Sequence, residues 1–222
     1  MICFCSLSLF ASPMLFEVPK LIVDSVQISV GDRNLVTDLY LECKTGEVIG
    51  IYGRNGCGKS MLFKSIFGTH TPQQIFVSID GKKITRPYLR PGLMGYLPQF
   101  PFMPESTNIK RLFIDYGNHP DDFFNRFPDE AWKYSMKLGQ LSSGQARLIE
   151  FYLILTGQYQ FVLLDEPFTF IAPVHIETFQ RIISEERKKK GLLITDHQHQ
   201  YVQQLADRDY ILDNGALKAV NI

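Results

Sequence analysis

The sequence predicts an α/β fold built around a largely parallel β-sheet. Short, uninterrupted apolar runs, such as "VIGIY" at 48–52 and "FVLL" at 161–164, alternate with longer segments of helical periodicity. Runs of this kind suit strands that are buried on both faces, as in parallel sheets covered by helices. The chain has 222 residues, of which 45% are hydrophobic, and this is enough for one domain with a substantial core.

The order of the elements adds detail to this fold. Period-2 alternation before residue 48, with a Gly-Asp turn at 31–32, predicts an N-terminal antiparallel β subdomain. Helical periodicity follows at 59–68, at 144–157 and at 174–190. The stretch 100–145 is rich in aromatic residues and proline, and we interpret it as a small helical insertion. We expect residues 14–222 to form one domain that contains this insertion.

The first 13 residues precede the patterned part of the chain. They include an apolar stretch but no Lys or Arg before it, so they lack the form of a signal peptide. We interpret them as an extension with little structural role; the alternatives are a short membrane-surface anchor and an ordered arm. No apolar run in the sequence reaches the roughly 18–20 residues that cross a bilayer.

Charge and cysteine content limit the classes of partner. The 23 basic and 23 acidic residues balance, so the sequence shows no basic footprint for nucleic acid and we expect none as a partner. The basic run at 187–190 is interpreted as the solvated end of a helix, with a local basic patch as the alternative. The four cysteines form no disulfide or metal framework, which indicates a reducing, cytoplasmic location.

A glycine-rich loop follows the first apolar run. "GRNGCGKS" at 53–60 lies between a predicted strand and a predicted helix, which is the context of a phosphate-binding P-loop. Glycines let backbone amides approach phosphate oxygens, the lysine reaches the β/γ-phosphates, and the serine hydroxyl ligates Mg²⁺. The candidate nucleotide-binding residues here are Gly53, Arg54, Asn55, Gly56, Cys57, Gly58, Lys59, Ser60 and Met61. Cys57 within this loop is also a candidate for reaction with thiol reagents.

Two carboxylates end the apolar run at 161–164. α/β sheets bind ligands at the carboxyl ends of their strands, and this is where Asp165 and Glu166 are predicted to lie. Asp165 is the candidate Mg²⁺ ligand, directly or through water, and Glu166 is the candidate group that polarises an attacking water.

A third motif makes the prediction specific. "LSSGQ" at 141–145 precedes a predicted helix, "GYLPQ" ends at Gln99, and "ITDH" ends at His197. Together with the P-loop and "DEP", this ordered set resembles the ATP-binding cassette (ABC) ATPase family from about residue 21 onward. The resemblance implies that Ser142, Ser143, Gly144 and Gln145 form the signature that binds ATP. It also implies that Gln99 senses Mg²⁺ and the attacking water, and that Glu166, Gln99 and His197 act in catalysis.

The resemblance implies partners as well. In the family, two cassettes close head to tail around two MgATP, so the second ABC ATPase subunit is a copy of this chain or a paralogue. A separate transmembrane permease subunit would dock on residues 99–140, placing the cassette on the cytoplasmic face of the membrane. The alternative is a soluble ABC ATPase of the cluster-assembly or clamp type, uncoupled from transport.

The sequence departs from the family pattern at three positions. Ser143 replaces the first glycine of the usual signature pair, and we expect at most a modest loss. Ala172 stands where an aspartate usually crosses the dimer interface, which removes a polar link. Val30 occupies the position where an aromatic side chain often stacks on adenine, and apolar contact would replace stacking at a cost of about 1 kcal/mol.

Overall fold

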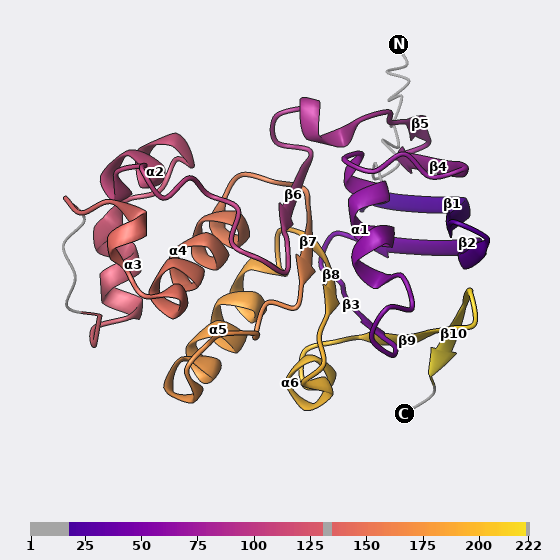
Figure 1. Ribbon diagram of the computed structural model, residues 1–222. Coiled ribbons are helices and arrows are strands. Elements are labelled where there is room, and N and C mark those ends of the chain that lie inside the picture. The colour runs from indigo at the N-terminus through magenta and orange to yellow at the C-terminus, as the bar shows by residue number, and fades with distance from the viewer. Residues whose placement is uncertain (1–17, 131–134, 221–222) are drawn as a thin grey trace, which may run out of the picture.

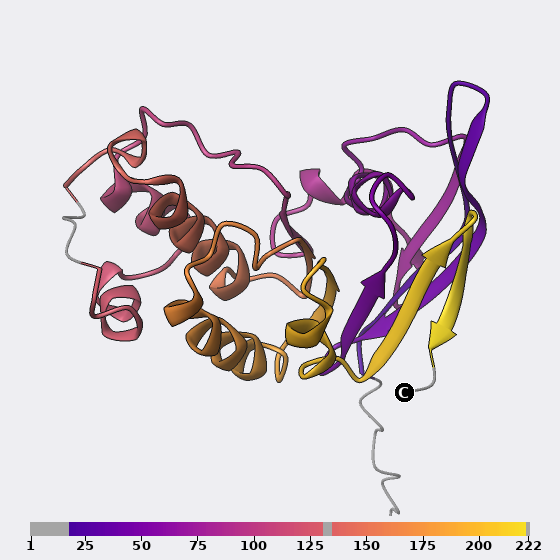
Figure 2. The ribbon, with the colours of Figure 1, turned by 60° about the horizontal axis from the view of Figure 1, so that its bottom comes forward.

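The computed structural model describes residues 18–130 and 135–220. In Figures 1 and 2 the helices α2 to α5 lie on one side of the molecule and an antiparallel sheet lies on the other. Residues 1–13, interpreted above as an extension, are outside the described residues. No helix of the described parts is both long and apolar enough to cross a membrane.

The core sheet has six strands in the order β10-β9-β3-β8-β7-β6. All neighbours are parallel except the edge pair β9 and β10, which confirms the largely parallel sheet. The four strands that carry apolar runs, β3, β6, β7 and β8, are buried along their whole length. The bounds are Val48–Tyr52 (β3), Met94–Leu97 (β6), Phe161–Asp165 (β7), Gly191–Thr195 (β8), Arg208–Asp213 (β9) and Ala216–Val220 (β10).

The second sheet is antiparallel, in the order β2-β1-β4-β5, and confirms the predicted β subdomain. Its strands are Lys20–Val30 (β1), Arg33–Lys44 (β2), Gln74–Ile79 (β4) and Lys82–Lys83 (β5). Gly31, in the left-handed conformation with φ 57°, and Asp32 make the predicted turn between β1 and β2.

Helices cover both faces of the core sheet. They are Lys59–Phe67 (α1), Ile109–Asp115 (α2), Pro120–Arg126 (α3), Ser143–Thr156 (α4), Pro173–Glu186 (α5) and His199–Gln203 (α6), with 3₁₀ turns at Pro87–Leu89 (η1) and Leu138–Gln140 (η2). Successive residues of β7 face opposite layers. Leu163 packs with α1 and the antiparallel sheet, whereas Leu164 packs with α4 and α5.

The helical insertion contributes aromatic side chains to the second of these layers. Phe113, Phe123 and Phe127 are at most 1% exposed and pack in the same cluster as α4 and α5. Figure 1 shows α2 and α3 at the end of the molecule farthest from β1 and β2. Most of the insertion's aromatic residues that the structure describes therefore serve the core, while Phe100 and Phe102 are exposed.

The basic run at 187–190 is not the solvated helix end that the sequence predicted. Lys190 is 4% exposed, pairs with Glu186, and donates to the carbonyls of Leu155 and Gly157. Arg187 pairs with Asp207. Free carbonyls at the end of α4 require donors, and long cationic side chains supply them. The expectation holds for the exposed Lys188 and Lys189 alone.

Candidate nucleotide-binding and catalytic site

The glycine-rich loop connects β3 to α1, as the sequence predicted. Gly58 caps α1 in the left-handed conformation with φ 114°, and a Cβ on it would lie 3.2 Å from the Cβ of Leu35. A Cβ on Gly53 would lie 2.6 Å from the carbonyl oxygen of Leu212. Both positions therefore require glycine, and the first amides of α1 remain available to an anion.

Lys59 folds back over this loop. Its Nζ donates to the carbonyl oxygens of Gly53 at 2.8 Å and Arg54 at 3.2 Å, and the residue is 6% exposed. An ammonium held at the mouth of a cradle of amides is placed to receive phosphate oxygens.

Asp165 ends β7 beside this loop. Its carboxylate accepts from Thr195 Oγ1 at 2.8 Å and from Tyr96 OH at 3.3 Å, and the Ser60 hydroxyl also bonds to it. Burial raises the pKa of Asp165, because a charged carboxylate is poorly solvated there. A nearby cation would offset this cost. The hard oxygen donors of Asp165 and Ser60 fit Mg²⁺ in this respect.

Glu166 lies at the centre of a polar cluster. Its backbone is left-handed, with φ 51°, a strained conformation for a residue other than glycine. One carboxylate oxygen accepts from Gln99 Nε2 at 2.9 Å and from Thr169 Oγ1 at 3.3 Å, and the other lies 2.7 Å from His197 Nε2. Three segments far apart in sequence thus meet at one carboxylate.

A cleft of about 250 Å³ joins these groups. Among the predicted residues, those that line it are Asn55, Gly56, Gly58, Lys59, Ser60, Met61, Gln99, Glu166 and His197. Arg54 and Cys57 line an adjacent hollow with Asn214, and Asp165 lies behind the cleft. A basic phosphate loop and a carboxylate held by an amide and an imidazole therefore share one space.

The predicted signature lies elsewhere and does not line this cleft. Ser142 and Ser143 are exposed at the start of α4. Ser142 is the N-cap: its Oγ accepts from Gln145 N at 3.2 Å, and Gln145 Oε1 accepts from Ser142 N at 3.1 Å. This reciprocal capping box holds both side chains at the end of the helix.

The signature's serine and glycine have different requirements. Ser143 is the first residue of α4 and has no positive φ, so a side chain is tolerated there. At Gly144, however, a Cβ would lie 3.2 Å from the carbonyl oxygen of Phe170. The substitution in this chain thus falls at the less constrained position of the pair.

An ion pair that the sequence motifs did not indicate supports the catalytic segment. Arg147 on α4 is fully buried and donates to the carbonyls of Pro98 at 2.7 Å and of Asp165 and Glu166 at 3.3 Å. Glu150, its neighbour at 3.6 Å, accepts from the amides of Phe102 and Met103 at 2.9 and 3.0 Å.

The pair therefore fixes the backbone on both sides of Gln99 and at the end of β7. In the sequence, this pair is indicated only by the presence of two charged residues within an otherwise apolar helix.

Two positions where the sequence departs from the family pattern lie outside the cleft. Val30 is 54% exposed at the end of β1 and does not line the cleft, whereas Leu35 at the start of β2 does. Ala172 is the N-cap of α5 and provides no side-chain cap, so the chain also lacks the helix-capping bond that an aspartate there would supply.

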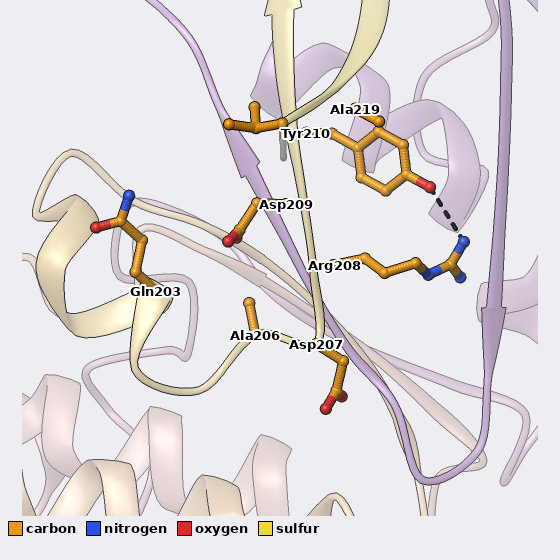
Figure 3. A pocket seen from close by; sticks show the side chains of 8 residues that line it. Gln203, Ala206, Asp207, Arg208, Asp209, Tyr210 and Ala219 are labelled. Atoms are coloured by element: carbon orange, nitrogen blue, oxygen red, sulfur yellow. Dashed lines mark hydrogen bonds between the residues drawn. The ribbon is translucent and has the colours of Figure 1, made fainter. Parts of the chain in front are cut away.

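A larger hollow of about 500 Å³ opens beside β9 and β10 (Figure 3). Its acidic groups are already engaged: Asp209 accepts from Tyr52 OH at 2.6 Å, and Asp207 accepts from Val48 N and pairs with Arg187. Arg208, on its wall, binds Glu47. These bonds join β9 to neighbouring elements, and we assign the hollow no ligand.

The fold and the cleft define the class of protein: a P-loop ATPase of the ABC type, in which a core sheet carries the phosphate loop and a helical insertion carries the signature. The family model described as ABC transporter matches residues 36–169, and the chain belongs to this family.

Individual relatives agree. An ABC transporter ATP-binding protein of Methanocaldococcus jannaschii is 27% identical over 91% of this chain and 77% of its own length. The lipopolysaccharide export system ATP-binding protein LptB of Escherichia coli K12 is 31% identical over 84% of each chain. Family and relatives identify the chain as the ATP-binding subunit of an ABC transporter, an ATPase.

Solved structures show the same fold. A structure described as the ATP-binding subunit of an ABC transporter matches with a TM-score of 0.75 and 23% identity over 90% of this chain and 88% of that chain. A bacterial Atm1-family ABC exporter with ATP bound gives 0.77 and 20% identity over 90% and 38%.

Proposed function

We propose that this subunit dimerises head to tail around two MgATP and that hydrolysis drives a separate membrane subunit. One observation carries the proposal. The side chain of Glu166 is held in place by its polar neighbours beside the P-loop, whereas the signature is exposed and lies outside the P-loop cleft. An exposed helix N-terminus with a serine and free amides suits a phosphate supplied by another chain. Association of two copies brings each signature to the other copy's cleft.

The residues divide the chemical work. Glu166 accepts the proton of the attacking water, and Gln99 and His197 hold its carboxylate in place. Lys59 and the loop amides bind the phosphates, and the partner's Ser142 and adjacent amides bind the γ-phosphate. Mg²⁺, when held by Ser60, Asp165 and the Gln99 amide oxygen, supplies charge neutralisation. Gln99 uses its amide nitrogen for Glu166, so the oxygen is the atom it offers to a metal.

The membrane partner is proposed to dock on residues 99–140. Phe100 is 64% exposed and Phe102 is 42% exposed next to Gln99, so both can act as apolar anchors for a partner. The name of the LptB relatives places them in an export system. By this proposal the subunit sits peripherally on the cytoplasmic face of the membrane. No cargo is assigned.

The Glu166→Gln variant tests the dimer. It should hydrolyse ATP at least about 100-fold more slowly, because the general base is lost, and should accumulate an ATP-bound dimer visible by light scattering after gel filtration. Glu177→Gln, an exposed change on α5, is the matched control and should behave as the parent. A Glu166→Gln protein that hydrolyses at the parental rate, or binds ATP and stays monomeric, contradicts the proposal.

The membrane partner has a test of its own. The tagged chain, purified from detergent-solubilised native cells, should retain a stoichiometric polytopic membrane protein. Phe100→Ser combined with Phe102→Ser should lose that partner while keeping ATP binding. A soluble partner retained in its place would indicate an ABC ATPase uncoupled from transport.

A further inference from the structure

A buried carboxylate joins the signature to the helix that follows the catalytic strand. Glu130, in the helical insertion, has a side chain only 11% exposed. One of its oxygens accepts from Gln145 Nε2 at 3.0 Å, and the other lies 3.0 Å from His175 Nε2 on the first turn of α5. We call Gln145, Glu130 and His175 the Glu130 bridge. Its histidine has no counterpart among the motifs found in the sequence.

The bridge acts on the signature through Gln145. That side chain already uses its amide oxygen to cap Ser142 N, and Glu130 holds its amide nitrogen. With both ends bonded, the amide can neither rotate nor flip, and the backbone amide of Gln145 stays directed at the Ser142 hydroxyl. The orientation of Ser142 therefore depends on the Glu130 carboxylate, to which Ser142 is linked through two successive hydrogen bonds.

The other end of the bridge is equally constrained. The His175 ring is also only 11% exposed and packs edge-on against the fully buried Phe127, with 5.5 Å between ring centroids. His175 lies three residues after Ala172, where the polar link expected from the family is missing. The helices α4 and α5 that it connects run side by side (Figure 1).

The same two regions meet at a second point. The carbonyl of Phe170 packs over Gly144, and Thr169, the preceding residue, donates to Glu166 at 3.3 Å. The segment from Glu166 to His175 thus contacts the signature twice, once through backbone and once through the bridge. This segment therefore provides a continuous series of contacts between the catalytic carboxylate and the signature.

We propose that His175 and Glu130 are positioning residues that hold the signature of this chain ready to bind the γ-phosphate in the other copy's site. The proposal rests on the proposed head-to-tail dimer. It predicts that breaking the bridge weakens ATP-dependent closure without disturbing either the P-loop cleft or the chemical step.

The test compares two substitutions of one residue in the full chain. His175→Phe keeps a ring against Phe127 but removes the donor, and it should raise the KM for ATP by about tenfold, the worth of one hydrogen bond, with kcat almost unchanged. His175→Gln retains an N–H donor of similar reach and should stay near the parent. Binding of a fluorescent ATP analogue to dilute monomer should be the same in all three proteins.

A double mutant separates the bridge from simple packing. Gln145→Met should raise the KM alone, and adding His175→Phe to it should change little, because both remove the same connection. Additive increases in KM for the double mutant would overturn the proposal. Equal increases in KM for His175→Phe and His175→Gln would also overturn it. Failure of the dimer itself is distinguishable, because it would appear in the parent and in Glu166→Gln rather than in the His175 variants alone.

Discussion

The two parts of the ATP site differ in how far one chain completes them. Around Glu166, three segments converge on one carboxylate inside a cleft that already contains the phosphate loop. Around Ser142, the chain offers an exposed helix end held by a capping box and by the Glu130 bridge. The hydrolytic part is thus organised within one chain, whereas in the proposed dimer the signature part is completed by a second copy. In that proposal, association is the step at which hydrolysis can be controlled.

The two parts also differ in how they are stabilised. The hydrolytic part rests on the buried pair of Arg147 and Glu150, both fully buried. The signature part rests on a helix cap, worth about 1 kcal/mol, and on the Glu130 bridge, whose carboxylate and imidazole are each 11% exposed. Substitutions should therefore damage the fold in the first region and mainly the ligand response in the second.

The largest effect is expected at the buried pair. Arg147→Met should lower the free energy of unfolding by about 3–5 kcal/mol, because it leaves the buried Glu150 carboxylate without its cationic partner. Adding Glu150→Gln should recover part of that loss. Urea denaturation of the ATP-free protein measures both, with the exposed Arg181→Met on α5 as control. A stable Arg147→Met protein with parental activity would show that α4 does not organise the hydrolytic part.

Next in size is the effect of the phosphate-loop lysine. Lys59→Ala should weaken ATP binding about 30- to 100-fold, because it removes a charged hydrogen bond of about 2–3 kcal/mol. Titration calorimetry on the monomer measures this directly. Lys64→Ala, on the exposed side of the same helix, should bind as the parent does. Equal binding by the Lys59 variant would remove the P-loop cleft as the nucleotide site.

Modification by a thiol reagent also tests the phosphate loop, and its expected effect is smaller. Cys57 is partly exposed, whereas Cys43 is buried and its pKa is raised by burial, so a maleimide should modify Cys57 in preference to Cys43. ATP at ten times its Kd should slow inactivation about tenfold, because only about a tenth of the protein then has a nucleotide-free site. Cys57→Ala should resist inactivation. If that variant is equally sensitive, the reaction that inactivates the protein lies at another residue.

Much of this arrangement was predictable because it depends on short motifs at strand ends. "VIGIY" and "FVLL" are buried on both sides in any parallel sheet, and the residues that follow them must meet at its carboxyl edge. Gln99 and His197 were placed by resemblance, and the structure brings both to Glu166.

The missed features depend on tertiary contacts that have no periodic signal. Arg147 is fully buried because it satisfies backbone carbonyls of two distant segments, and Lys190 because α4 leaves carbonyls free nearby. His175 received no role from the sequence, since its partner Glu130 is 45 residues away. A charged residue within an apolar helix is the one such signal that could be read in advance.

The smallest expected effect concerns binding of the nucleotide base. Neither the hydrolytic part nor the signature part of the site provides a well-formed pocket for the base. Val30 is exposed and Leu35 alone reaches the cleft from the β1–β2 hairpin. Val30→Tyr should tighten ATP binding by about fivefold, because stacking on adenine adds about 1 kcal/mol. Competition between ATP and GTP measures the change, and Val18→Tyr, another exposed apolar position, is the control. An unchanged affinity would mean that Leu35 and the loop hold the base without stacking.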